Sequence, residues 1–307
     1  MIEVVAQSAI IIAGGVVWRL LNPTGLDPSL ARRVLTGLVY ALLLPALVLQ
    51  VMWGSRVSLA TVQIAGFALF GLMAALAASL AWYRHARLPA AQIGALVLAA
   101  TFPNVTYLGL PVLEHTLGTW ARSVAVQYDL FACTPFLLTV GVAIARRHGN
   151  NEGEHSVLRA LFSIPALWAA VAGLSFNAAG WAPPSWLNGL LSMLAAGVVP
   201  LMLISLGLGL TWPENWRQRF KTIIPAVLIQ MFLTPVVLFA GTALLGIETQ
   251  LAIAIVLEAA MPSMLLGVVL CDRFGLDTSF YALTVTVTTL LSLATLPFWF
   301  YIATMFL

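Results

Sequence analysis

Long apolar runs are the feature that most constrains how this chain can fold. Between charged and turn-forming residues, the sequence offers ten stretches that are nearly free of charge. Because a helix needs about 20 apolar residues to cross a bilayer, these runs predict an all-α polytopic membrane protein with ten transmembrane helices. The predicted spans are residues 2–21, 31–53, 57–83, 90–113, 119–145, 158–180, 185–211, 221–245, 249–271 and 278–305.

Composition excludes the water-soluble classes of protein. Only 8% of the residues are charged and 61% are hydrophobic, whereas a soluble domain carries about 25% charged residues. So few charges cannot cover a surface that faces water, which excludes a soluble enzyme and a disordered chain. The net charge of +3 is too sparse for a surface that binds nucleic acid.

The basic residues predict how the chain is oriented in the membrane. Twelve of the 14 lie in or beside the odd-numbered connections between spans, and only Arg56 and Arg122 lie on the opposite side. Since positively charged loops stay in the cytoplasm, both termini are expected outside the cytoplasmic (inner) membrane. This alternation of charge requires an even number of spans and therefore supports ten.

Prolines recur inside the predicted spans at a slowly rising separation. The matching pairs are Pro45 and Pro200, Pro103 and Pro262, and Pro135 and Pro297. A proline within a helix removes a backbone hydrogen bond, so its position is informative. We predict two five-helix repeats, 1–145 and 158–307, joined by a cytoplasmic linker at 146–157. Because five is odd, the second repeat enters from the opposite side, an inverted repeat that is typical of secondary transporters.

The stretch least suited to a helix at membrane depth runs from Thr101 to Pro111, and its counterpart in the second repeat contains Pro262. Non-helical backbone is tolerated there only when it is buried in protein or lines a water-filled cavity. Half-helices that begin at such breaks direct N–H groups and positive dipole ends toward an anion. We therefore expect the loose peptide groups of both breaks to face a wet cavity that binds an anionic substrate. The predicted substrate-binding residues are Pro103, Asn104, Val105, Gly109, Pro262 and Ser263.

Two carboxyl side chains, Asp129 and Glu258, lie within predicted spans. At a helix centre a charged side chain costs about 2.5–3.5 kcal/mol to insert, so neither is expected to face lipid. A carboxyl that is removed from water can bind and release a proton near neutral pH. Both are therefore candidates for proton or ion coupling, and the alternative is a hydrogen-bonded carboxyl that locks helices together.

Other kinds of chemistry lack a sequence pattern. The chain has no hydrolytic constellation and no metalloprotease motif. Its two cysteines, Cys133 and Cys271, form neither a disulfide framework nor a zinc pattern. We expect no enzymatic activity, no metal and no cofactor.

The motif Asn104-Val-Thr-Tyr-Leu-Gly109-Leu-Pro111 resembles the signature of the auxin efflux carrier family, and the stretch from Ala260 to Pro297 is similar to that family's C-terminal half. The resemblance covers essentially the whole chain. It implies two inverted five-helix repeats whose fourth and ninth helices are broken and cross each other. It also implies a scaffold domain of spans 1, 2, 6 and 7 and a transport domain of spans 3–5 and 8–10.

The resemblance carries further expectations about the site. In that family the counterpart of Asn104 helps to bind a substrate carboxylate, and transport is thought to follow an elevator scheme. Bacterial relatives are associated with small organic anions such as malate and malonate. The sequence departs from the family at the second crossover, where Ser263 replaces an asparagine, and in its short central linker, which argues against control by phosphorylation as in plant members.

These observations predict a secondary transporter that moves a small organic anion, such as a monocarboxylate, a dicarboxylate or an auxin-like compound. Elevator-type alternating access would be driven by the membrane potential or by protons. The alternatives are a sodium-coupled organic anion symporter resembling the bile-acid transporters and, from another class, a membrane sensor or channel. The expected partners are the anion, a proton or sodium ion and membrane lipid, without nucleic acid, and a homodimer is compatible with the sequence.

Overall fold

The computed structural model describes residues 2–23, 25–55, 58–149, 162–213 and 215–307. Every regular element among these residues is helical, so the chain is an all-helical polytopic membrane protein. Most of the predicted linker and the start of the sixth predicted span lie outside the described residues. Within the described residues, six helices are long and apolar enough to cross a membrane: Pro28–Gly54, Leu59–Tyr83, Ala121–His148, Ser185–Gly209, Trp216–Leu244 and Thr278–Phe306.

Several of these long helices consist of consecutive α-helical and π-helical segments. The first contains α2 (Pro28–Leu38), η1 (Val39–Leu43) and α3 (Leu44–Gly54). The helix Ala121–His148 contains α7 (Ala121–Tyr128), η3 (Asp129–Cys133), α8 (Thr134–Phe136), η4 (Leu137–Gly141) and α9 (Val142–His148). The others are α12 (Ser185–Ala196) with α13 (Val198–Gly209), and α14 (Trp216–Leu228) with η5 (Ile229–Leu233) and α15 (Thr234–Leu244).

The remaining described helices are single or shorter. Four of them are α1 (Ile2–Leu21), α4 (Leu59–Tyr83), α11 (Pro165–Ala178) and α18 (Thr278–Phe306). The others form two interrupted helices: α5 (Ala90–Thr101) with η2 (Val105–Gly109) and α6 (Leu110–Leu117), and α16 (Thr249–Ala259) with α17 (Gly267–Phe274). Each of the ten predicted spans therefore contains helix, although only six helices meet the length needed to cross a membrane.

A proline follows four of the π-helical segments at the same place, as the second residue of the next helix. The four are Pro45, Pro111, Pro135 and Pro235. A proline ring collides with the carbonyl four residues earlier in an α-helix, and the wider π turn moves that carbonyl away. At Pro235 the carbonyl four residues earlier belongs to Met231, and it accepts a hydrogen bond from the Trp299 indole at 2.9 Å. The prolines thus set the positions of the π turns.

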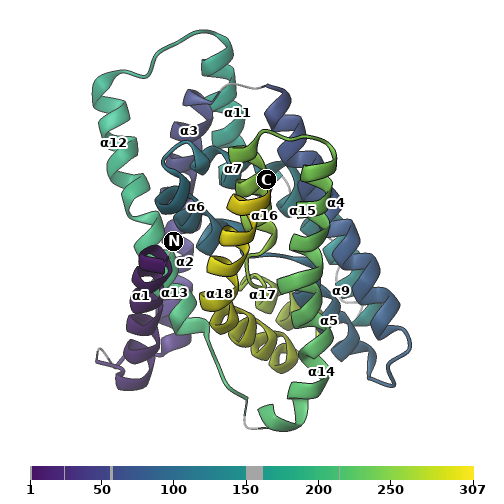
Figure 1. The fold of residues 1–307 in the computed structure, drawn as a ribbon. Helices are drawn as coiled ribbons and strands as arrows, with labels where there is room; N and C mark the ends of the chain where they lie inside the picture. Colours follow the sequence, from purple (N-terminus) through teal and green to yellow (C-terminus); the bar gives the residue numbers. More distant parts are fainter. Residues whose placement is uncertain (1, 24, 56–57, 150–161, 214) are drawn as a thin grey trace.

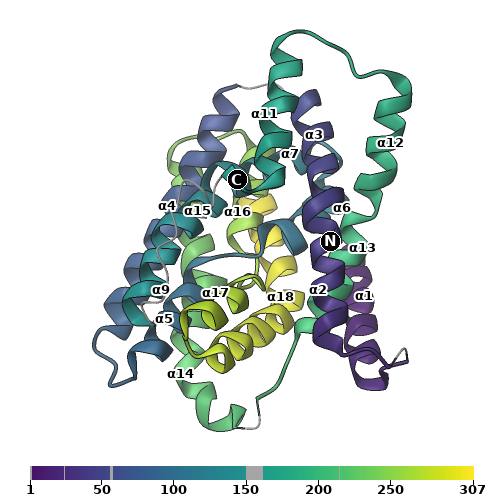
Figure 2. The same cartoon turned by 180° about the vertical axis from the view of Figure 1, so that it is seen from behind.

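The helices pack in two groups (Figures 1 and 2). One group contains α1, α2, α3, α11, α12 and α13, with α11 packed along α3 and α1 along α13. A Cβ added at Gly15 of α1 or Gly207 of α13 would collide with the backbone of the other helix, so glycine permits this close crossing. The other group contains α4, α5, α9, α14, α15, α16 and α18. The segments η2 and α7 pack against the second group, through α16 and α4. The two groups meet where α1 contacts α18, α13 contacts η2 and α3 contacts α7.

Candidate functional site

Two interrupted helices meet inside the protein, at the positions that the sequence predicts for breaks. The first helix ends at Thr101 and resumes at Val105, and the second ends at Ala259 and resumes at Gly267. The residues between are almost all buried, so these breaks are enclosed by protein rather than exposed to lipid. This satisfies the condition for non-helical backbone at membrane depth.

The two breaks form a short antiparallel bridge in which Pro103 lies opposite Ser263. Two backbone hydrogen bonds flank the bridge: Asn104 N to Pro262 O at 2.7 Å and Met264 N to Phe102 O at 2.9 Å. In this kind of pair the N–H groups of the two facing residues point away from the partner strand. Proline therefore loses no bond at position 103, and its break is stabilised by the other break.

Ser263 joins the bridge to the surrounding helices. Its N–H donates to the Thr288 hydroxyl at 3.1 Å, and its own hydroxyl donates to the Ala99 carbonyl at 2.6 Å. Ser263 is completely buried. Its hydroxyl is therefore already used to hold the crossing.

Carbonyls at and just beyond the end of α16 accept hydrogen bonds from a side chain of another helix. Gln230, buried in η5, donates its amide to the carbonyl of Met261 at 3.0 Å and to that of Ala259 at 3.4 Å. The expectation that the loose peptide groups of both breaks face a wet cavity is therefore wrong in part. Several of them bind each other or Gln230, because an unbonded buried peptide group is costly.

A cavity of about 380 Å³ adjoins the first break, and we name it the central cavity. Its polar lining includes Asn104, which precedes η2, and Asp129 and Thr134 from the helix Ala121–His148. The Asn104 side chain is only 3% exposed, and its Nδ2 has no hydrogen-bond partner among the described residues. The first turn of a helix also leaves backbone N–H groups without helical partners. The residues of this first turn, 105–107, line the same cavity as Asn104.

The rest of the central cavity lining consists of one cation, two phenols and many apolar side chains. Arg273 is the only basic side chain among the described residues that line it. Tyr40 and Tyr107 add phenol groups. The apolar lining residues are Leu44, Val105, Leu130, Leu137, Leu138, Ile164, Ala166, Met264, Leu266, Val269 and Leu270. Such a site, largely apolar with a few placed polar groups, suits a small organic molecule with a charged end.

Asp129 is held in the central cavity by two hydroxyls. Thr106 donates to one carboxyl oxygen, and Thr134 donates to the other at 2.8 Å. Thr106 belongs to η2 and Thr134 follows η3, so the carboxyl links the first broken helix to the helix Ala121–His148. A substitution of Asp129 would therefore remove a hydrogen bond of Thr106, next to the first break.

Glu258 lies outside the central cavity, in the protein interior. It is fully buried, and neither carboxyl oxygen has a hydrogen-bond partner among the described residues. Its carboxyl lies against Gly109. Both predicted coupling residues therefore contact η2, Glu258 through Gly109 and Asp129 through Thr106.

The structure places the predicted substrate residues in different surroundings. Asn104 and Val105 line the central cavity. Pro103, Pro262 and Ser263 form the bridge beside it, and Gly109 makes room for Glu258.

Sequence reasoning missed the residues that complete the site. These are Tyr40, Thr106, Tyr107, Thr134, Gln230 and Arg273. A lone amide within an apolar span could have revealed Gln230, because a polar side chain in a membrane needs a partner. Arg273 was counted only as a charge that orients the chain.

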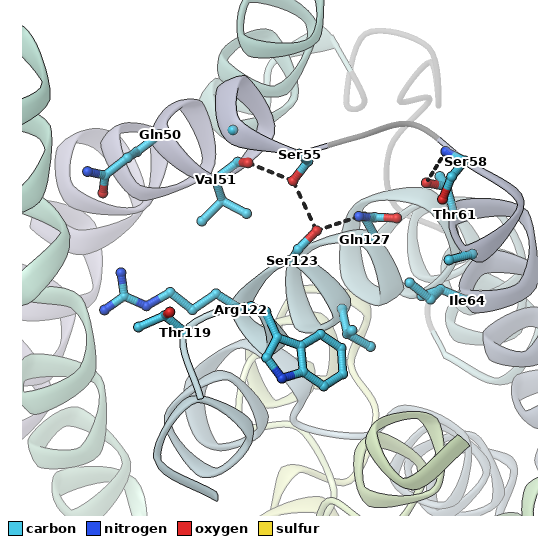
Figure 3. A pocket seen from close by; sticks show the side chains of 14 residues that line it. Gln50, Val51, Ser55, Ser58, Thr61, Ile64, Thr119, Arg122, Ser123 and Gln127 are labelled. Carbon is cyan, nitrogen blue, oxygen red and sulfur yellow. Dashed lines mark hydrogen bonds between the residues drawn. The ribbon is translucent and has the colours of Figure 1, made fainter. Parts of the chain in front are cut away.

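A second cavity, of about 440 Å³, lies between α3, the start of α4 and α7, and we name it the outer cavity (Figure 3). Ser55 and Ser123 are joined there by a hydrogen bond of 3.0 Å, and the Gln127 amide donates to Ser123 at 2.6 Å. Gln50 and Arg122 also line this cavity, but both side chains extend away from the hydrogen-bonded Ser55, Ser123 and Gln127. The Gln50 amide donates to Asn188 at 3.0 Å and to Ser192 at 2.7 Å.

Comparison with known proteins gives consistent matches. Residues 1–300 match the profile of a family described as membrane transport protein. An uncharacterized transporter of Methanothermobacter thermautotrophicus is 31% identical over 222 residues, which are 71% of this chain and 70% of that protein. An uncharacterized transporter of Methanocaldococcus jannaschii is 26% identical over 211 residues, 68% of each chain.

Proposed function

The chain belongs to the membrane transport protein family, which is the auxin efflux carrier family, and from that premise we propose that it is a secondary transporter of a small organic anion. The observation that carries the proposal is the buried, unpartnered Asn104 amide in the central cavity. Together with the first N–H groups of η2, it offers hydrogen bonds to a carboxylate. Arg273, which also lines the central cavity, supplies the opposite charge.

The substrate class follows from the size and lining of the central cavity. A volume of about 380 Å³ suits a small molecule. Its mainly apolar walls favour a compact organic body over an inorganic ion. A monocarboxylate, a short dicarboxylate or an auxin-like acid meets these conditions.

Movement would follow an elevator scheme between two inverted repeats, 1–145 and 158–307, joined by the linker at 146–157. Support comes from the two packing groups, because spans 1, 2, 6 and 7 make one group, the scaffold, and the transport domain would comprise spans 3–5 and 8–10. The central cavity takes Tyr40 and Ala166 from the first group and Asn104 and Asp129 from the second. Sliding one group past the other would carry the Asn104 site between the two faces of the inner membrane, with both termini outside.

Coupling to protons would pass through Asp129. An anionic carboxyl and an anionic substrate in one small cavity repel each other. A proton on Asp129 removes that repulsion, and Thr106 and Thr134 hold the carboxyl in place in either state. The membrane potential would drive the movement of any net charge that the substrate and proton carry together.

Binding of a carboxylate panel to Asn104→Ala and to the wild type tests this function. Thermal stabilisation by mono- and dicarboxylates, followed by uptake into proteoliposomes, gives two readouts. Loss of a hydrogen bond to a charged group should weaken binding about tenfold or more. Asn215→Ala, at an exposed asparagine, serves as the control. Unchanged binding and uptake by Asn104→Ala would show that the site is misplaced.

A sodium-coupled symporter is the second candidate, and Glu258 favours it. A buried carboxyl without a partner among the described residues offers the oxygen ligands that a hard cation prefers. Uptake driven separately by sodium and by proton gradients distinguishes the two. Sodium-driven uptake that Glu258→Gln abolishes would replace the proton scheme.

A further inference from the structure

The same two helices line both the outer cavity and the central cavity. The helix of α2 and α3 lines the central cavity with Tyr40 and the outer cavity with Gln50. The helix that begins at α7 lines the outer cavity up to Gln127 and the central cavity from Asp129 onward. Buried Leu47 lies between the two levels of the first helix.

Seven of the 14 described residues that line the outer cavity carry a hydroxyl or an amide group. The polar lining residues are Gln50, Ser55, Ser58, Thr61, Thr119, Arg122, Ser123 and Gln127. Gln127 is only 5% exposed, and its Oε1 has no hydrogen-bond partner among the described residues. Buried polar atoms are nearly always bonded, so an unpaired one indicates a missing partner such as a ligand or water. An amide oxygen accepts hydrogen bonds, so the missing partner of Gln127 is a donor such as water.

Arg122 is the only basic residue among the described residues that line the outer cavity. Its guanidinium forms an ion pair with Glu114, while its buried Nε has no hydrogen-bond partner there. Glu114 lines a different cavity, of about 360 Å³, which Arg122 also reaches. Arg122 therefore stands between two spaces, with a protein carboxylate on one side and an open polar cavity on the other.

The charge pattern of the sequence points to the same residue independently. Twelve basic residues gather on one side of the predicted membrane topology, and Arg122 is one of two on the other side. A basic residue there opposes the usual distribution. Binding of an anion gives a reason to keep it.

We propose that the outer cavity is a second subsite for the transported carboxylate, in which Arg122 exchanges Glu114 for the substrate carboxylate. The proposal rests on the proposed transport of organic anions. An anion would pause there on its way to or from the central cavity. A guanidinium can bind both oxygens of a carboxylate at once, which a lysine cannot match in geometry.

Malonate binding to the full chain in detergent tests the proposal, with thermal stabilisation as the readout. We expect Asn104→Ala and Arg122→Gln each to lose part of the malonate response, and the double variant to lose all of it. Arg122→Lys should keep more of the response than Arg122→Gln. Arg147→Gln, at an exposed arginine, should match the wild type. A full malonate response in Arg122→Gln, or no response in the wild type, overturns the outer subsite.

The same set of variants separates this proposal from the proposed function. If Asn104→Ala responds like the wild type while Arg122→Gln loses its response, the central site fails and the outer subsite stands. The reverse pattern removes the outer subsite and keeps the central one.

A charge exchange tests whether Arg122 acts only through its ion pair. Glu114→Arg combined with Arg122→Glu can rebuild the pair but places a carboxylate on the outer cavity wall. Thermal stability without malonate should then recover, while malonate binding stays at least about tenfold weaker than in the wild type. Recovery of malonate binding along with stability would make Arg122 a structural residue and overturn the proposal.

Discussion

The carboxyl of Glu258 lies against the α-carbon of Gly109, in the space that a side chain at position 109 would fill. Glu258 belongs to α16 and Gly109 to η2, so the contact joins the two broken helices beyond the bridge of Pro103 and Ser263. The backbone of Gly109 is ordinary helix, with φ −62° and ψ −51°. Glycine is therefore required by the neighbour, not by the backbone angles.

Gly109→Ala is expected to lower the free energy of unfolding by about 1–3 kcal/mol, because the added methyl overpacks a site from which Glu258 cannot move into water. Unfolding by SDS in mixed micelles measures the loss. Adding Glu258→Ala removes the obstruction, so the double variant should be more stable than Gly109→Ala alone. Gly66→Ala is the control, since a Cβ there meets nothing within 4 Å. Equal stability of Gly109→Ala and the wild type would refute the packing role.

Ser263→Ala should lower the free energy of unfolding by about 0.5–2 kcal/mol, the range for hydrogen bonds between membrane helices. The substitution leaves the buried Ala99 carbonyl without its donor, at the crossing itself. Ser175→Ala is a matched control, because exposed Ser175 makes a similar bond of 2.7 Å to the Val171 carbonyl. The same SDS titration compares them. A cost at Ser263 no larger than that at Ser175 would contradict a special role of the crossing.

Tyr83 inserts its hydroxyl into α14 beside Pro225. The hydroxyl donates to the Thr222 carbonyl at 2.9 Å and accepts from Ala226 N–H at 3.1 Å, in place of the direct helical bond between them. Tyr83→Phe should therefore cost about 1–2 kcal/mol of unfolding free energy. The cost should shrink when Pro225→Ala lets the helical bond form again. Exposed Tyr301→Phe provides the control, and thermal unfolding in detergent provides the measurement.

The breaks could be predicted from sequence, whereas the bonds that close them could not. Pro103 and Pro262 each remove a helical hydrogen bond within an apolar span, and non-helical backbone at that depth must be enclosed. Nothing local, however, says that the partner of one break is the other. The pairing of Asn104 N–H with the Pro262 carbonyl, and of Gln230 with the end of α16, depends on how distant helices pack.

Which side chains line the cavities was harder to predict, for a related reason. An α-helix advances about 100° per residue, and each π turn inserts a residue that rotates everything after it. The turn η3 begins at Asp129, so a regular helix drawn through the fifth span would misplace Thr134. The prolines that follow π turns mark these shifts, and Pro135 is the one that marks η3.

Asp129→Asn should abolish malonate accumulation driven by a pH gradient and leave malonate exchange at equal pH largely intact, if Asp129 carries the coupled proton. An amide cannot gain or lose that proton, yet its oxygen can still accept a hydrogen bond from Thr106 or Thr134, so the fold should persist. Proteoliposomes with an imposed pH gradient, compared with counterflow at equal pH, separate the two activities. Asp272→Asn, at an exposed carboxyl, should behave like the wild type in both assays. Gradient-driven accumulation that survives in Asp129→Asn would move the coupling to another group or to the membrane potential alone.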